Sequence, residues 1–392
     1  MTQRRKVLIV AILSTSSLLV LVGLLEVGAR VFGFRGVPKL HSTQPRIPHS
    51  TRGWAFKPNL AFSFLGTEGW VEGSTDAEGF RPVRSGRDLR DSPIVVCLGD
   101  STTFSGESPD DRTWPEAASR ALAEQGIAVR MLNRGIRGYN TVQSLLTLQE
   151  TLKDEKVGRL VRAVVYHFCG NDPSENLAPG RPHLAAASPE GSFPARPLRV
   201  VIPPASDALP SERRWTGKFY DRSAFAAAIR RAKLDVSRAA FQKGCTEYMD
   251  MFTGWYQDFV ARPALQQSMK VALAELAREC TARNVPLFVS FSIVPAWDGD
   301  KRCRRDLLDL SGESPEKFQT RASSYVVAFD WLRETTEEVG ATFVDLRNCL
   351  AALSHREYVA APDDWHFGPA ANEKLGRAIA EHLRVRLQGK PR

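Results

Sequence analysis

The sequence is poor in cysteine and lacks the cysteine spacings of metal sites. Its six cysteines form no CxxC pair, and none lies beside a pair of histidines as zinc sites require. The low count also excludes a disulfide scaffold. We therefore expect no metal site and no cofactor. Cys97 and Cys169 lie in apolar, strand-like runs and are expected to be buried thiols, whereas the sequence leaves the pairing of the others open: Cys245, Cys280, Cys303 and Cys349.

The sequence also lacks the signatures of nucleic-acid-binding proteins. The net charge is +9, but the basic residues are scattered among acidic ones, and no finger, basic zipper or RNA-binding motif is present. We expect a solvated basic surface and no nucleic-acid partner. With 392 residues, 43% hydrophobic and 25% charged, the chain is long enough for a sizeable core, and general disorder and collagen-like structure are excluded.

One long hydrophobic run is present, at residues 7–25. It follows Arg4-Arg5-Lys6, and at about 1.5 Å per residue a helix of this length nearly crosses a hydrocarbon core. We predict a single-pass anchor, with residues 1–34 forming the cytoplasmic tail and the span. The rest of the chain is expected outside the cytoplasm, because a short tail stays inside more readily than a domain. A cleaved signal peptide is the alternative, although its apolar core is usually about 7 to 15 residues long and Leu24-Leu25-Glu26-Val27 offers no clean cleavage site.

Beyond the anchor, the chain divides into a short irregular region and a long alternating one. Residues 35–92 contain scattered Pro and Gly without a sustained period, and we interpret them as a linker and membrane-proximal cap with short strands around residues 54–64. Over residues 93–392, apolar β-branched runs alternate with helical patterns. The expected strands are 94–98, 129–132, 163–168, 286–292 and 342–346, and the expected helices are 114–125, 141–152, 264–283, 315–339 and 370–387. This alternation predicts an α/β domain with a doubly wound, parallel, five-stranded sheet covered by helices on both faces.

An insertion at residues 173–262 interrupts the alternation. It shows no strand pattern, holds eight prolines between Pro179 and Pro210, and then has helical patterns at residues 223–241 and 246–260. Such a segment is either a functional lid or a disordered loop. Its aromatic residues form either a sugar-stacking face or part of the core: Trp215, Phe219, Tyr220, Trp255 and Tyr256.

Polar and glycine residues follow the predicted strands where each strand ends. The first strand ends in Gly99-Asp100-Ser101, which places a serine at the edge where open α/β sheets bind ligands. A helix cap is the alternative role for these residues. The motif is not the GxSxG elbow of the common α/β-hydrolases, because Thr103 stands where the second glycine would be.

Three later segments could complete a hydrolytic site. Gly138, in a glycine-containing loop after the second strand, lets the backbone approach a substrate, and Asn171, after the third strand, can donate a hydrogen bond to a developing oxyanion. Near the C-terminus, Asp363 precedes His366 by three residues, a spacing at which a carboxylate can orient an imidazole that acts as general base. Asp364 is an alternative orienting acid. His167, inside an apolar strand, is expected to be a core histidine.

Taken together, these segments resemble the four blocks of the SGNH/GDSL hydrolases: Ser101 in GDST, Gly138 in NRGIRGYNT, Asn171 in GND, and the pair Asp363 and His366. The resemblance covers roughly residues 93–387. Three further segments look like the lead-in of membrane-anchored bacterial members: Gly53-Trp54, Lys57-Pro58-Asn59 and Gly79-Phe80-Arg81. One departure is that Cys169 stands where the third block usually has glycine, from which we expect altered packing rather than lost chemistry.

The resemblance implies a flavodoxin-like strand order and a serine esterase. Ser101, His366 and Asp363 would be the catalytic residues, and the oxyanion hole would comprise the N–H groups of Ser101 and Gly138 with the Asn171 amide. The expected function is an exported, membrane-anchored esterase that acts on a small-molecule or glycan substrate carrying short acyl or O-acetyl esters, of carbohydrate or lipid. The alternative is an O-acyltransferase that passes the same acyl group to an envelope glycan. A non-enzymatic envelope scaffold is disfavoured by the retained site residues.

Overall fold

The computed structural model describes residues 3–32, 46–66, 69–86, 91–185, 199–202, 250, 254–292, 314–350, 353–361 and 364–388. The chain divides into two compact units. The N-terminal helix belongs to the first, and every other described element belongs to the second, which comprises Ser42–Glu212 and Phe241–Arg392.

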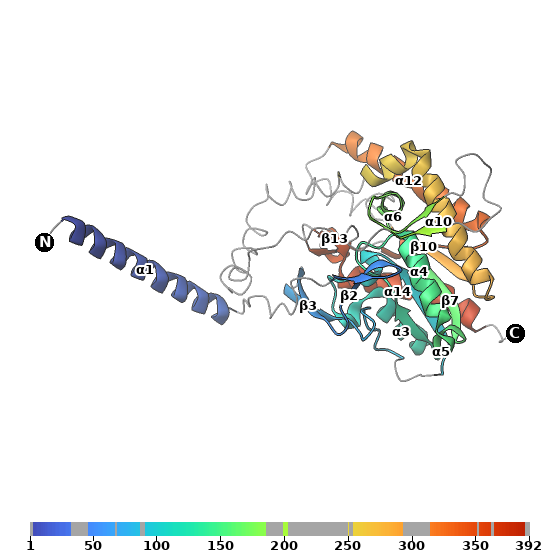
Figure 1. Ribbon diagram of the computed structural model, residues 1–392, viewed down its shortest axis with the longest axis horizontal. Helices are drawn as coiled ribbons and strands as arrows, with labels where there is room; N and C mark the ends of the chain where they lie inside the picture. The colour runs from blue at the N-terminus through green and yellow to red at the C-terminus, as the bar shows by residue number, and fades with distance from the viewer. Residues whose placement is uncertain are drawn as a thin grey trace. The chain divides into compact units, whose positions relative to one another are not determined.

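The N-terminal helix α1 extends over Gln3–Val31 (Figure 1). Its 29 residues give a length of about 43 Å at 1.5 Å per residue, more than the hydrocarbon thickness of a bilayer. The stretch Ile12–Val31 is apolar enough to cross a membrane, and its side chains are largely exposed. By length and composition, α1 fits either an anchor or a signal sequence.

The second unit is built on a parallel sheet of five strands. These are β5 (Ile94–Gly99), β6 (Arg130–Asn133), β7 (Val161–His167), β10 (Leu287–Phe291) and β11 (Thr342–Asp345), in the order β11-β10-β7-β5-β6. Numbered along the chain, this is the flavodoxin-like order 2-1-3-4-5. The predicted α/β fold with a five-stranded parallel sheet is confirmed.

The main helices cover both faces of the sheet: α3 (Trp114–Glu124), α4 (Thr141–Lys153), α10 (Pro263–Thr281), α12 (Pro315–Glu338) and α14 (Pro369–Leu387). Their starts follow local chemistry, since Thr113, Asn140 and Ser314 each accept a backbone N–H at a helix N-terminus. In Figure 1, α3 and α14 lie together on one side of the sheet, and α4 and α10 lie on the other. The shorter helical elements include α5 (Glu155–Gly158), the 3-10 turns Asp110–Arg112 and Asn348–Leu350, and α13 (His355–Tyr358).

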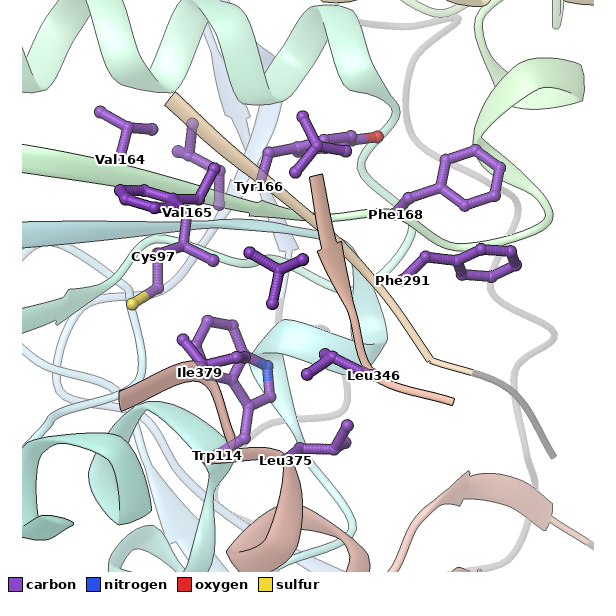
Figure 2. Close-up of a cluster of buried hydrophobic side chains, with 14 of the residues drawn as sticks. Cys97, Trp114, Val164, Val165, Tyr166, Phe168, Phe291, Leu346, Leu375 and Ile379 are labelled. Atoms are coloured by element: carbon purple, nitrogen blue, oxygen red, sulfur yellow. The ribbon is translucent and has the colours of Figure 1, made fainter. Parts of the chain in front are cut away.

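The core lies between the sheet and these helices. Val164 and Tyr166 of β7 point to one side of the strand, while Trp114 of α3 and Ile379 of α14 lie on the other side (Figure 2). The strands are apolar on both faces because both faces are covered. This core fixes the carboxyl ends of β5, β6 and β7 at a common edge.

Residues 46–86, predicted as linker and cap, pack closely against the sheet domain. They form two antiparallel hairpins, β1 (Arg46–His49) with β2 (Gly53–Phe56) and β3 (Ala61–Gly66) with β4 (Gly69–Ser74). Trp54, Phe56 and Phe80 are buried in a cluster with residues that follow β5 and β6: Phe104, Ile136 and Tyr139. The cap is therefore part of the hydrophobic core beside the predicted site.

The insertion contains structure that its sequence pattern did not predict. After α6 (Asp172–Glu175), β8 (His183–Ala185) pairs antiparallel with β9 (Arg199–Val201), so the expectation of no strand in this segment is corrected. Strands of three residues are too short to show a period. Residues 254–261 are helical and overlap the second expected helix, whereas residues 223–241 lie outside the described part of the chain.

Candidate active site

Ser101 lies where β5 ends, at the first position of the short helix α2 (Ser101–Phe104). The cap of this helix is Asp100, whose Oδ1 accepts the Thr102 N–H at 2.9 Å. The Ser101 hydroxyl donates to Oδ2 of the same carboxylate at 3.2 Å. The capping role thus falls to Asp100, and the part-exposed Ser101 side chain is placed at the carboxyl edge of the sheet.

His366 lies on the strand β13 (Asp364–Phe367), which pairs with β12 (Val359–Ala361). The strand β13 also contacts α2, so the elements carrying Ser101 and His366 meet at the same edge of the sheet. Asp363 lies outside the described residues. Nδ1 of His366 is 3.9 Å from Oε1 of Glu107, a residue that the sequence motifs did not single out.

The loop with Gly138 is held by two arginines from distant segments. Arg46 Nη2 donates to the Arg137 carbonyl at 3.2 Å, and Arg181 donates to the Gly138 carbonyl. Both guanidinium groups lie over the Trp54 ring, 5.3 and 5.2 Å from its centroid. Gly138 has φ +76°, a left-handed conformation that favours glycine. The Gly138 N–H shares its peptide unit with the Arg137 carbonyl, so the bond from Arg46 fixes its orientation.

Asn171 immediately precedes α6, after the end of β7. Its Oδ1 is buried and accepts no hydrogen bond within the described part of the chain. The preceding Gly170 packs against Tyr256, where a Cβ atom would lie 2.8 Å from the phenol oxygen. The glycine of this block is thus required at 170, and Cys169, at the family's usual glycine position, is buried beside it.

Tyr256 is a core residue, 5% exposed and 5.2 Å from the Tyr325 ring, which excludes it from a solvent-facing sugar platform. Trp255 is partly exposed, and the other aromatics proposed for such a face lie outside the described residues: Trp215, Phe219 and Tyr220.

Buried polar groups hold the backbone at the carboxyl end of β7, next to Asn171. Asp172 accepts the Tyr166 hydroxyl at 2.5 Å and the Cys169 N–H at 2.9 Å. Burial, together with the nearby charge of Asp100, raises the pKa of Asp172 well above its usual range. These contacts join the end of β7 to the start of α6, and so fix the backbone on which Asn171 sits.

His167 is confirmed as a core histidine. It is 1% exposed, its Nδ1 lies 2.9 Å from Ser290 Oγ, and Trp114 and Phe367 pack around its ring. Burial lowers the pKa of His167 to about 4, so the ring is neutral at pH 7. Its role is structural.

The cysteines follow the expected pattern where they can be compared with it. Cys97 and Cys169 are buried thiols, as predicted, and burial raises the pKa of both well above the usual value. Cys280 and Cys349 are free, while Cys245 and Cys303 lie outside the described residues. Over the described ranges, no group of three His, Cys, Asp or Glu side chains is arranged to hold a metal ion.

Comparison with known proteins assigns the family. Residues 97–374, more than half of the chain, match the GDSL-like Lipase/Acylhydrolase family, and the chain belongs to this family. It is thus an esterase or acylhydrolase of the SGNH/GDSL class. No curated protein gives a significant match.

Solved structures of similar proteins include TesA (13% identity, TM-score 0.38, covering 75% of this chain and 99% of TesA). They also include an inhibitor-bound aryl esterase of M. smegmatis (13% identity, TM-score 0.36, covering 75% of this chain and 99% of the esterase). A third is the psychrotrophic esterase EstA of a Pseudoalteromonas species (9% identity, TM-score 0.38, covering 75% of this chain and 98% of EstA).

Proposed function

We propose that this chain is an exported, membrane-anchored serine ester hydrolase that removes short acyl or O-acetyl groups from carbohydrate or lipid. The observation that carries the proposal is the contact of α2 with β13, which places Ser101 and His366 on adjoining elements at the carboxyl edge of the sheet. The family match supports ester chemistry at this edge.

In the proposed reaction, the Ser101 oxygen attacks the ester carbonyl and His366 takes its proton. The alcohol then leaves with that proton, and water, activated by His366, hydrolyses the acyl-enzyme. Asp363 is assigned the orienting role. The N–H groups of Ser101 and Gly138 and the Asn171 amide are assigned to the oxyanion, where one such donor contributes about 3 to 4 kcal/mol.

The surroundings of the site favour a polar substrate with a small acyl group. Three arginine side chains lie around Gly138: Arg46, Arg137 and Arg181. Charged groups of this kind suit the hydroxyl-rich alcohol part of a sugar ester better than a long alkyl chain. The length and apolar character of α1 support attachment to a membrane.

The test uses the full chain in detergent. A fluorophosphonate probe should label the wild type and not Ser101→Ala, and a p-nitrophenyl ester series should show the highest kcat/KM at short chain length. Labelling that persists in Ser101→Ala would exclude Ser101 as the nucleophile. Product analysis with an acyl donor and glycan acceptors separates hydrolysis from O-acyl transfer, because only transfer yields acylated glycan.

A truncation tests the anchor separately. Deleting residues 1–34 should release a soluble esterase, because α1 belongs to a different compact unit from the sheet. A folded but inactive product would mean that the N-terminal segment completes the site. Cleavage of the natural product after residue 25 would establish a signal peptide instead.

A further inference from the structure

A second carboxylate, Glu107, faces the imidazole of His366. Its Oε1 lies 3.9 Å from Nδ1, and its side chain is only 3% exposed. The other oxygen, Oε2, is buried and accepts no hydrogen bond from the residues that the structure describes. A buried carboxylate with unused acceptor capacity, placed next to a group that becomes cationic, can stabilise that cation.

The loop that carries Glu107 is tied directly to the strand that carries His366. Ser108 Oγ donates to the carbonyl of Phe367, the residue after His366, at 3.3 Å. Asn372 of α14 donates to the same carbonyl at 3.1 Å and to Ser108 Oγ at 2.8 Å. These bonds lie next to Glu107 in one segment and next to His366 in the other, so the separation of the two side chains is set by the fold.

The loop that carries Glu107 is also bound by the buried guanidinium group of Arg81. Arg81 donates to the carbonyls of Ser105 and Ser108, at 3.1 and 2.8 Å, and pairs with Asp110 at 2.8 Å. The Arg81 side chain is fully buried. The loop that carries Glu107 is thus fixed from the cap as well as from β13.

Glu107 has a cationic partner that keeps it in place. Arg137 Nη1 lies 2.5 Å from Oε1, and a buried carboxylate requires such a partner. The charged groups around Glu107 are Arg137, Arg81 and Asp110, and Arg84 also pairs with Asp110, at 3.1 Å. Within this cluster, Glu107 is the carboxylate that lies beside His366.

We propose that Glu107 is a positioning residue for His366: its carboxylate orients the imidazole through Nδ1 and stabilises the imidazolium formed when Ser101 loses its proton, a task shared with Asp363. This inference rests on the proposed function. The 3.9 Å between Nδ1 of His366 and Oε1 of Glu107 is longer than a hydrogen bond, so the interaction in the resting enzyme is a through-space electrostatic attraction. Such contacts often shorten when the charged intermediate forms.

The test compares Glu107→Gln with Glu124→Gln, in which the same chemical change is made on an exposed side chain paired with Arg377. We expect Glu107→Gln to lower kcat on p-nitrophenyl acetate about tenfold with KM within about twofold, because the carboxylate acts on the imidazolium and not on bound ester. The acidic limb of kcat/KM should shift down by about one pH unit. Glu124→Gln should match the wild type, and Glu107→Asp should restore the acidic limb because it keeps the charge.

A second variant, at the cationic partner of Glu107, keeps the inference falsifiable if Glu107→Gln fails to fold. Arg137→Gln removes the cation that partly neutralises Glu107, so the acidic limb should move to higher pH, opposite to the shift in Glu107→Gln. An unchanged limb in the folded variants, or shifts in the same direction, would overturn the inference.

A readout independent of turnover separates this inference from the proposed function. The pKa of His366 can be followed by NMR in the full chain with 13C-labelled histidine, using His366→Gln to assign the signal. A lower pKa in Glu107→Gln supports the inference even if no ester is hydrolysed, whereas an equal pKa refutes it. Failure of the proposed function would appear separately, as a wild type that neither hydrolyses esters nor reacts with the fluorophosphonate.

Discussion

Replacing the buried Arg81 with methionine should destabilise the enzyme strongly. The guanidinium group is fully buried, pairs with Asp110 at 2.8 Å, and lies over the rings of Phe62 and Phe104. Methionine preserves most of the side-chain length and the apolar contacts, so the change removes mainly the charge and its hydrogen bonds.

The magnitude follows from what each partner loses. The Ser108 carbonyl loses its Arg81 donor, which costs about 1 to 3 kcal/mol, while the Ser105 carbonyl keeps the N–H of Ser108. Asp110 keeps Arg84 at 3.1 Å and the hydroxyl of Ser74, so the full penalty of an uncompensated buried charge is not reached. The lost charge-assisted hydrogen bond to Asp110 adds about 2 kcal/mol, so the sum is about 3 to 5 kcal/mol.

The matched control is Arg84→Met. Arg84 pairs with the same Asp110, but its side chain is 64% exposed, and an exposed ion pair contributes about 0 to 1 kcal/mol. Urea unfolding followed by tryptophan fluorescence should give a far lower midpoint for Arg81→Met than for Arg84→Met, at similar slope. Equal losses in the two variants would refute the role assigned to burial.

Three further predictions concern the site and the core. Asn171→Ala should lower kcat about 100-fold or more with a smaller change in KM, since its hydrogen bond strengthens as the oxyanion forms; an effect on KM alone would assign it to ground-state binding. Asp363→Ala should cost far more kcat/KM than Asp364→Ala on a short-chain ester, and the reverse order would move the orienting role to Asp364. Because burial lowers the pKa of His167 from 6.5 to about 4, its neutral form stabilises the fold above pH 6.5, and about 3 kcal/mol should be lost as the pH falls from 6.5 to 4. Urea midpoints over this range should fall less steeply in His167→Asn, and parallel profiles would contradict the assignment.

The sheet was predictable because its signals are local. The strands β5, β7 and β10 are short apolar runs, and the helix starts carry caps or a proline in the first turn. Ser101, Gly138, Asn171 and His366 could be selected because each follows a strand or precedes a helix at a position where ligand-binding groups recur.

The rest of the site depends on contacts between residues far apart in sequence. Two such contacts are those of Glu107 with His366 and of Arg181 with the Gly138 carbonyl. Neither contact corresponds to a periodic pattern or a motif in the sequence. The packing of Trp54 against Tyr139 was not predicted for the same reason, because residues 35–92 have the irregular Pro and Gly content that is typical of a linker. Long-range ion pairs and aromatic contacts thus account for what the sequence could not predict.

The hairpins of residues 46–86 determine where this enzyme can be cut or recombined. A fragment that starts at residue 93 would leave Phe104, Ile136 and Tyr139 without their apolar cover, and the 105–108 segment without Arg81. The smallest independently folding catalytic unit must therefore begin before residue 46. Chimeras that exchange the N-terminal segment should be joined upstream of this point. A change at Trp54 will need a compensating change at Tyr139, whose ring packs edge-on against the indole with the centroids 5.6 Å apart.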